Sequence, residues 1–90
     1  MTPYRTIKSP REVLDYVLAP EGAGWAGDSI ASAVMTYEGG ISVVEDAVTP
    51  VSYHYTISGG QPGRSGLVRI LLISAQGLRH EAEHTVTIVR

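Results

Sequence analysis

The sequence predicts an all-β domain, and three observations support this fold class. Glycine-rich turn signals divide the chain at intervals of roughly 8 to 12 residues, as expected for a series of short strands. Two segments alternate apolar and polar residues with the period of two that a half-buried strand requires. The chain has 90 residues and no cysteine, so one small core is held by packing alone or with help from an assembly. These features predict an antiparallel β-sandwich of about seven strands.

The N-terminal third is the ambiguous part of the sequence. Ser9, Pro10 and Glu12 form a capping-box pattern that would open a short helix through Leu18. The alternative is a turn at Ser9 and Pro10 followed by a strand through Tyr16. We favour the strand, because so short a helix is unstable without packing.

Three segments after Gly39 are predicted strands. The first is GISVVED, residues 40–46. The second spans residues 51–58, and its apolar side chains fall on one face: Val51, Tyr53, Tyr55 and Ile57. The third spans residues 81–88, and a single face carries these side chains: Ala82, His84, Val86 and Ile88.

Between the last two strands lies GLVRILLIS, residues 66–74, a run rich in branched apolar residues that predicts a strand buried on both faces. One small core takes only one of these faces, so we expect the other to meet a neighbouring protein. Ile70 and Leu72 lie on one side and Leu71 and Ile73 on the other, and either pair is compatible with the core. The candidate protein-contact residues are Trp25, Ile70, Leu71, Leu72 and Ile73.

Composition limits the classes of partner. A net charge of −2 with 43% hydrophobic residues describes an ordinary globular chain without affinity for nucleic acid or an anionic membrane. The absence of cysteine excludes disulfides and thiolate metal sites. The N-terminus lacks the apolar region of a secretion signal, and no run approaches the roughly 18 apolar residues of a membrane span. We therefore expect protein partners.

GAGWAG, residues 22–27, matches the G-x-G-x-x-G pattern of dinucleotide-binding loops. That function requires a parallel βαβ unit with a helix after the glycines. Everything after Gly39 instead has the pattern of strands and turns, and the bulky Trp25 fits poorly in a tight phosphate loop. The sequence favours a glycine-rich loop between strands.

HEAEH, residues 80–84, matches the H-E-x-x-H zinc signature, in which a helix brings two histidines onto one face. In a strand, the two imidazoles would be anchored roughly 13 Å apart and would not share an ion. We expect a strand here, with the nitrogens of His84 hydrogen-bonded at the end of the core.

SGGQPGRSG, residues 58–66, resembles a phosphate-binding P-loop only superficially, because its first position is serine rather than glycine. Its glycines and proline predict a chain reversal that needs positive φ angles. No set of residues suited to nucleophilic or acid–base catalysis is apparent. The prediction is a protein that is not an enzyme, with no catalytic residues, no cofactor and no metal.

Five segments, in order along the chain, resemble a family of small bacteriophage virion proteins known as fibre-tail adaptors. They are VLDY (13–16), WAGDSIAS (25–32), GISV (40–43), ISGG (57–60) with Gly63, and TVTIV (85–89). The resemblance implies a single immunoglobulin-like β-sandwich over residues 10–90, with residues 1–9 as an N-terminal arm, and it makes DSIASAVMTY a strand. Met35 replaces the tryptophan usual in the family, and Ile70, Leu71 and Ile73 replace a more polar stripe, which implies additional apolar surface.

The resemblance also implies a function. It points to a structural virion protein that joins a fibre or spike to a tail or head as symmetric copies, after synthesis in the host bacterial cytoplasm. Its partners would be other virion proteins and further copies of itself, and the family supplies no catalytic residues. Three alternatives stay open: capsid decoration, a sugar-binding immunoglobulin-like module that uses Trp25 and the tyrosines, and a nucleotide- or zinc-dependent enzyme that uses residues 22–27 or 80–84.

Overall fold

Seven β-strands make up the computed structural model, which describes residues 2–20 and 28–89. The strands are β1 (Thr2–Lys8), β2 (Leu14–Leu18), β3 (Ile30–Glu38), β4 (Ile41–Val48), β5 (Tyr53–Gly59), β6 (Ser65–Ser74) and β7 (Arg79–Ile88). The part of the chain that the structure describes contains no helix, and hence none that would cross a membrane. The all-β prediction is confirmed.

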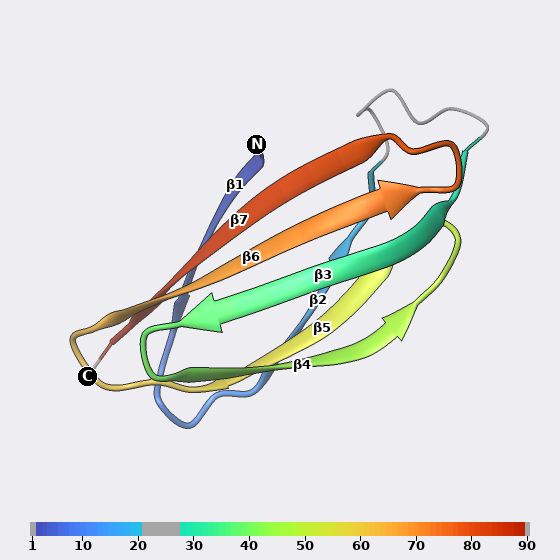
Figure 1. Ribbon diagram of the computed structural model, residues 1–90. Coiled ribbons are helices and arrows are strands. Elements are labelled where there is room, and N and C mark those ends of the chain that lie inside the picture. Colours follow the sequence, from blue (N-terminus) through green and yellow to red (C-terminus); the bar gives the residue numbers. More distant parts are fainter. Residues whose placement is uncertain (1, 21–27, 90) are drawn as a thin grey trace.

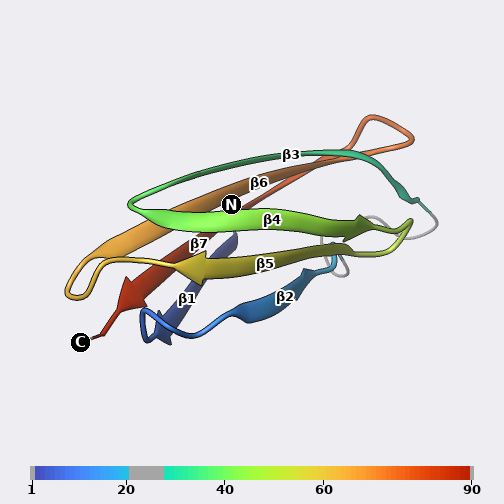
Figure 2. The ribbon, with the colours of Figure 1, turned by 90° about the horizontal axis from the view of Figure 1, so that it is seen from below.

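The strands form two sheets that pack face to face (Figures 1 and 2). The larger sheet has the order β1-β7-β6-β3 and the smaller sheet the order β2-β5-β4. All pairs are antiparallel except β1 with β7, which run parallel. Residues 2–8 of the segment assigned to an N-terminal arm form this β1 edge strand.

The core lies between the sheets and is built by alternation along each strand. On β5 the buried side chains are Tyr53, Tyr55 and Ile57. On β7 they are Ala82, His84, Val86 and Ile88, as the period of two predicts. Val51 precedes β5 and is 65% exposed, so the alternation predicted for this segment ends before it.

β6 is buried on one face only, which corrects the prediction of a strand buried on both. Val68, Ile70 and Leu72 are at most 1% exposed and face the smaller sheet. Leu71 and Ile73 point the other way and are partly exposed, because no second layer of the described residues covers this side of the larger sheet.

The segment between β1 and β2 is a turn rather than a helix. The Ser9 amide donates to the Glu12 carboxylate (2.8 Å), and the Glu12 amide donates to the Ser9 carbonyl (3.2 Å). The hydrogen bond from the Ser9 backbone lowers the pKa of Glu12. The capping-box residues therefore close a single turn, and the strand favoured from the sequence follows it as β2.

The turn between β5 and β6 depends on glycine, as predicted. Gly59, Gly60 and Gly63 have φ angles of 72°, 108° and 79°, which disfavour side chains. A Cβ atom at Gly60 would lie 2.5 Å from Cδ1 of Ile88, so this position is also sterically closed. The turn thus packs directly against the end of the core.

Lys8 joins the two sheets at the same end of the sandwich. Its side chain is 1% exposed, and Nζ donates to the carbonyl oxygens of Gly59 (2.6 Å) and Ser9 (2.7 Å). Because Lys8 ends β1 and Gly59 ends β5, this buried lysine fastens the N-terminal strand to the opposite sheet.

Candidate protein-contact surfaces

An apolar patch lies on the outer face of the larger sheet. It consists of Val34 on β3 and of Leu71 and Ile73 on β6, and we call it the outer stripe. Val34 lies directly opposite Leu71 in the strand register and is 53% exposed. Cross-strand neighbours of this kind interact, so the stripe is one surface rather than three separate side chains.

Polar residues surround the outer stripe. Within the same register, Leu71 lies beside Glu81, and Ile73 lies between Ser32 and Arg79. Next to them, the guanidinium of Arg69 pairs with the carboxylate of Glu83 at 3.6 Å. An apolar centre with a charged rim has the composition of a protein contact.

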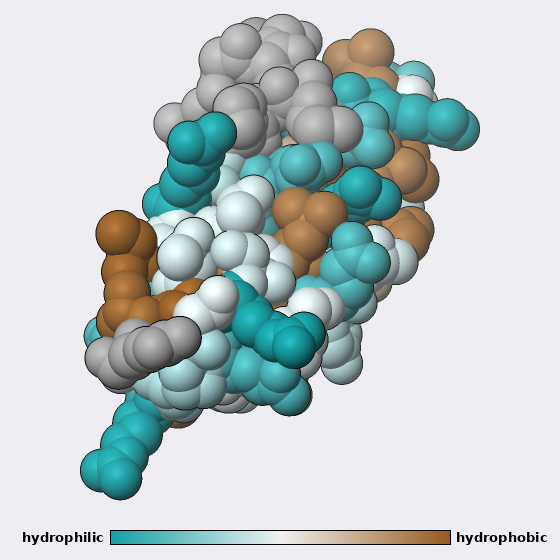
Figure 3. All heavy atoms as spheres, turned by 90° about the vertical axis from the view of Figure 1, so that its left-hand side faces the viewer, coloured by the Kyte–Doolittle hydropathy of each residue, from teal (hydrophilic) through white to brown (hydrophobic). Residues whose placement is uncertain are grey.

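Exposure alone does not single out this surface. Figure 3 shows apolar side chains as separate groups among polar atoms on another side of the molecule. Scattered apolar residues of that kind are normal on a soluble domain. The stripe is distinguished by the register, which places its side chains together.

The structure shows which of the candidate contact residues on β6 face the core and which face outward, a choice that the sequence left open. Ile70 and Leu72 lie in the core, so they are not surface contacts. Leu71 and Ile73 lie together on the outer face. Trp25 lies outside the described residues.

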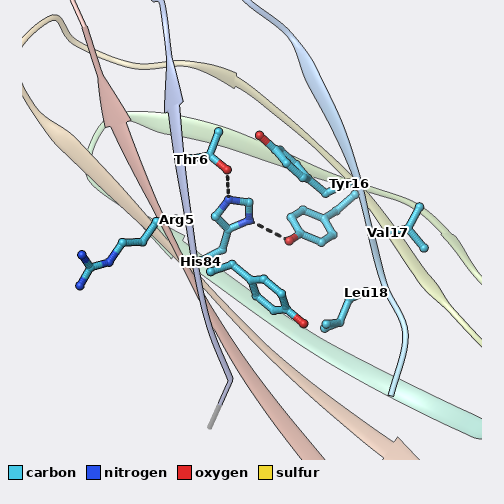
Figure 4. A pocket seen from close by; sticks show the side chains of 8 residues that line it. Arg5, Thr6, Tyr16, Val17, Leu18 and His84 are labelled. Carbon is cyan, nitrogen blue, oxygen red and sulfur yellow. Dashed lines mark hydrogen bonds between the residues drawn. The ribbon is translucent and has the colours of Figure 1, made fainter. Parts of the chain in front are cut away.

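A second feature is a cavity of about 230 Å³ where β1 and β2 border the gap between the sheets (Figure 4). The following residues line this edge cavity: Tyr4, Arg5, Thr6, Tyr16, Val17, Leu18, Tyr55 and His84. They come from both sheets, and most are aromatic or apolar. Figure 4 shows the guanidinium of Arg5 directed away from the rings.

His84 forms the polar end of this cavity. It is 2% exposed, and its ring nitrogens lie 2.8 Å from the Tyr55 hydroxyl (Nδ1) and 2.7 Å from the Thr6 hydroxyl (Nε2). A neutral imidazole has one donor and one acceptor nitrogen, so it serves both hydroxyls. Burial lowers the pKa of His84 and raises the pKa of Tyr55. Both groups are therefore neutral at pH 7, and the hydrogen-bonding expected for His84 is confirmed.

Aromatic packing fixes the cluster. The ring of Tyr16 meets that of His84 edge-on, with centroids 4.6 Å apart, and stacks on Tyr55 at 5.6 Å. Tyr53 is fully buried on the same strand face as Tyr55, as its alternation predicts. Rings packed this way are held in place by core contacts.

Sequence reasoning missed this cavity because β1 inverts its hydropathy pattern. Thr6 and Lys8 face inward, whereas Ile7 is 71% exposed. From hydropathy alone, Ile7 would face the core, and Thr6 and Lys8 would face the solvent. The only signal was Tyr4, two positions before Thr6 on the same face.

The two catalytic motifs are not supported by the local structure. HEAEH lies on strand β7, not on a helix, so the zinc-protease arrangement does not form. GAGWAG falls outside the described residues, but residues 30–38 after it form β3 where dinucleotide binding needs a helix. Across residues 2–20 and 28–89, no cluster of three histidine or acidic side chains is placed to hold a metal ion.

Comparisons with known proteins identify first the fold class and then the protein family. The architecture is that of a small immunoglobulin-like β-sandwich. The crystal structure of titin M3 domain resembles it with a TM-score of 0.57 at 9% identity, covering 100% of this chain and 92% of that one. The solution structure of amebosin matches at 16% identity with a TM-score of 0.43, covering 96% of this chain and 98% of that one. No curated protein matches the chain.

Residues 8–87 match the model of the Gp77 family, described as podophage GP4 fiber-tail adaptor protein gp77. The chain belongs to this family. Membership confirms the resemblance found in the sequence and supports a structural role in the phage virion.

Proposed function

We propose that the chain is a non-enzymatic adaptor that joins a fibre or spike to the tail or head of a phage particle. The observation that carries the proposal is the family match over residues 8–87. Copies made in the host bacterial cytoplasm would enter the particle in a symmetric arrangement with one another. The other virion proteins are then the partners of the domain.

We assign the outer stripe to the contact with a neighbouring protein in the particle. Its three apolar side chains lie adjacent on two paired strands, and charged residues frame them. A neighbour that covers the stripe removes apolar area from water, which is favourable. A domain of this size has little stability in reserve, so a contact that stabilises it would also favour its assembly.

Cryo-electron microscopy of purified particles tests this function. The adaptor role predicts density for the domain at the junction between fibre or spike and the tail or head. Density spread over the capsid lattice would instead identify a decoration protein. Absence of the protein from purified particles would contradict a virion role altogether.

A thermal-shift screen tests the remaining alternatives. A ligand that binds only the folded state raises the melting temperature. The adaptor role predicts no shift with NAD, ATP, zinc or a panel of cell-surface sugars. A clear shift with NAD, ATP or zinc would support an enzyme, and one with a sugar would support a lectin-like module.

A further inference from the structure

The smaller sheet is one strand short of the immunoglobulin arrangement. In that fold, the first strand pairs with the second in a four-stranded sheet. Here β1 pairs with β7 of the other sheet, and in the part of the chain that the structure describes the smaller sheet consists of β2, β5 and β4. Within the described residues, β2 pairs on one side with β5 and has no strand on its other side.

This free edge has unpaired backbone groups. Residues along a strand direct their N–H and C=O groups alternately to either side, so part of Leu14–Leu18 offers hydrogen bonds away from β5. Such an edge is a template for another strand. Val13 and Val17, at 64% and 61% exposed, add apolar side chains beside it.

The edge cavity lies next to the free edge. Its volume of about 230 Å³ is below the range of about 300 to 1,000 Å³ typical of pockets for whole small ligands. Its walls are the aromatic rings and the neutral His84 described above. The space therefore suits one large apolar side chain carried by an added strand.

Charge limits the sequence of that strand. Among the described residues, Arg5 is the one charged side chain that lines the cavity, since His84 is neutral and no carboxylate contributes. The guanidinium of Arg5 points away from the rings (Figure 4), so a charged group inside the cavity would have no partner. The recognised segment is thus extended and carries an uncharged, apolar side chain at the position that enters the cavity.

We propose that β2 accepts an extended segment of a partner virion protein as an additional strand, with an apolar side chain in the edge cavity. That the partner is a virion protein rests on the proposed function. The addition of a strand to β2 does not depend on that function. Strand addition of this kind takes affinity from main-chain hydrogen bonds and specificity from a side-chain pocket.

A second copy of the domain does not meet these requirements through its own β2. The inward side chains of that strand already pack in their own sandwich: Leu18 is 2% exposed, and Tyr16 packs against the core. A β2–β2 contact would therefore leave the cavity unfilled. The occupant must be a segment whose side chains are free on both faces.

The test uses the full chain and a capped heptapeptide, Thr-Val-Thr-Leu-Glu-Val-Thr. Binding is followed by NMR up to about 1 mM peptide, the range of weak recognition. We expect amide shifts confined to β2 and the cavity residues, with slower hydrogen exchange in residues 14–18. No shifts, or shifts centred on the outer stripe, would overturn the proposal.

Two N-methylated peptides test strand pairing directly. One has methyl groups on the amides of Val, Leu and Val, and the other on those of Thr and Glu. An added strand uses only one of its edges, so one methylated peptide should lose binding and the other should keep it. Equal binding of both would show that main-chain pairing plays no part and would overturn the proposal.

Failure of these peptide experiments leaves the location of the domain in the particle unaffected, so the two proposals fail separately.

Discussion

The inner and outer faces of the larger sheet differ in what their apolar residues do. On the inner face, Val68, Ile70 and Leu72 of β6 are fully buried against the smaller sheet. On the outer face, Leu71 and Ile73 of the same strand join Val34 in a partly exposed stripe. Apolar residues of one strand thus either build the core or form a partly exposed surface, and their alternation along β6 decides which.

The inner face also contains a buried polar side chain, His84, whose ring nitrogens are both paired. His84 lies among apolar residues of β7 and β6, and its nitrogens bind Thr6 and Tyr55. Buried polar groups are tolerated when they are hydrogen-bonded. Substitutions on the inner face should therefore destabilise the domain strongly. On the outer face, the polar neighbours of the stripe stay in water, so substitutions there should disturb the fold less.

The largest expected effect is the loss of folding on the inner face. Ile70→Ser with Leu72→Ser should unfold the domain, because core truncations of this size cost roughly 2 to 5 kcal/mol each. Circular dichroism and a denaturant titration measure the outcome. A folded double variant would contradict the assignment of this face to the core.

Two tyrosines on β5 give a matched comparison within the core. Tyr55→Phe leaves a buried nitrogen of His84 unpaired and should cost about 1 to 3 kcal/mol. The hydroxyl of Tyr53 has no hydrogen-bond partner among the described residues, so Tyr53→Phe should change the free energy of unfolding by less than about 0.5 kcal/mol. Equal effects in urea titrations would show that the hydrogen bond to His84 is unimportant.

The pH dependence of stability is the next effect in size. Burial lowers the pKa of His84 in the folded state below its ordinary value of 6.5, so the unfolded chain takes up the proton first. Stability should therefore be complete above this value and fall with pH below it, by at most about 1.4 kcal/mol per pH unit. The fall should end once the folded state also binds the proton.

Substitution of the histidines checks this assignment. His84→Gln should abolish the slope between pH 6.5 and about 5, above the ordinary pKa of 4.5 of Glu12, whereas His54→Gln, on the outer face of the smaller sheet, should retain it. Among the described residues, His84 is surrounded by Tyr4, Thr6, Tyr16 and Tyr55, with no negative charge that would stabilise the imidazolium. A slope that persists in His84→Gln would place the titrating group elsewhere.

Sequence reasoning was accurate where hydropathy alternates strictly. The second half of β7 and all of β5 have one apolar and one polar face, which fixes both their structure and their orientation. β6 is apolar at four consecutive positions, 70–73, so its orientation was undetermined: a shift of one residue exchanges its faces without changing the pattern.

The N-terminal strand was beyond sequence reasoning for a physical reason. β1 buries Lys8, which is stable only because two backbone carbonyls accept its hydrogen bonds, one from the adjacent Ser9 and one from the distant Gly59. It also turns Ile7 outward. Since those partners become known only with the fold, the edge cavity that β1 helps to form was equally unpredictable.

The outer face gives the most direct test of the account. Leu71→Ser with Ile73→Ser should lower the free energy of unfolding by less than the inner-face pair does, because both side chains are partly exposed. The measurement is incorporation of this variant into phage particles, quantified in purified virions beside the unmodified chain. A control with Val44→Ser and Val51→Ser removes apolar groups that are 58% and 65% exposed elsewhere. The account predicts that the control enters particles normally and that the stripe variant stays folded but is excluded. Normal incorporation of the folded stripe variant would contradict the assignment of the outer face to assembly.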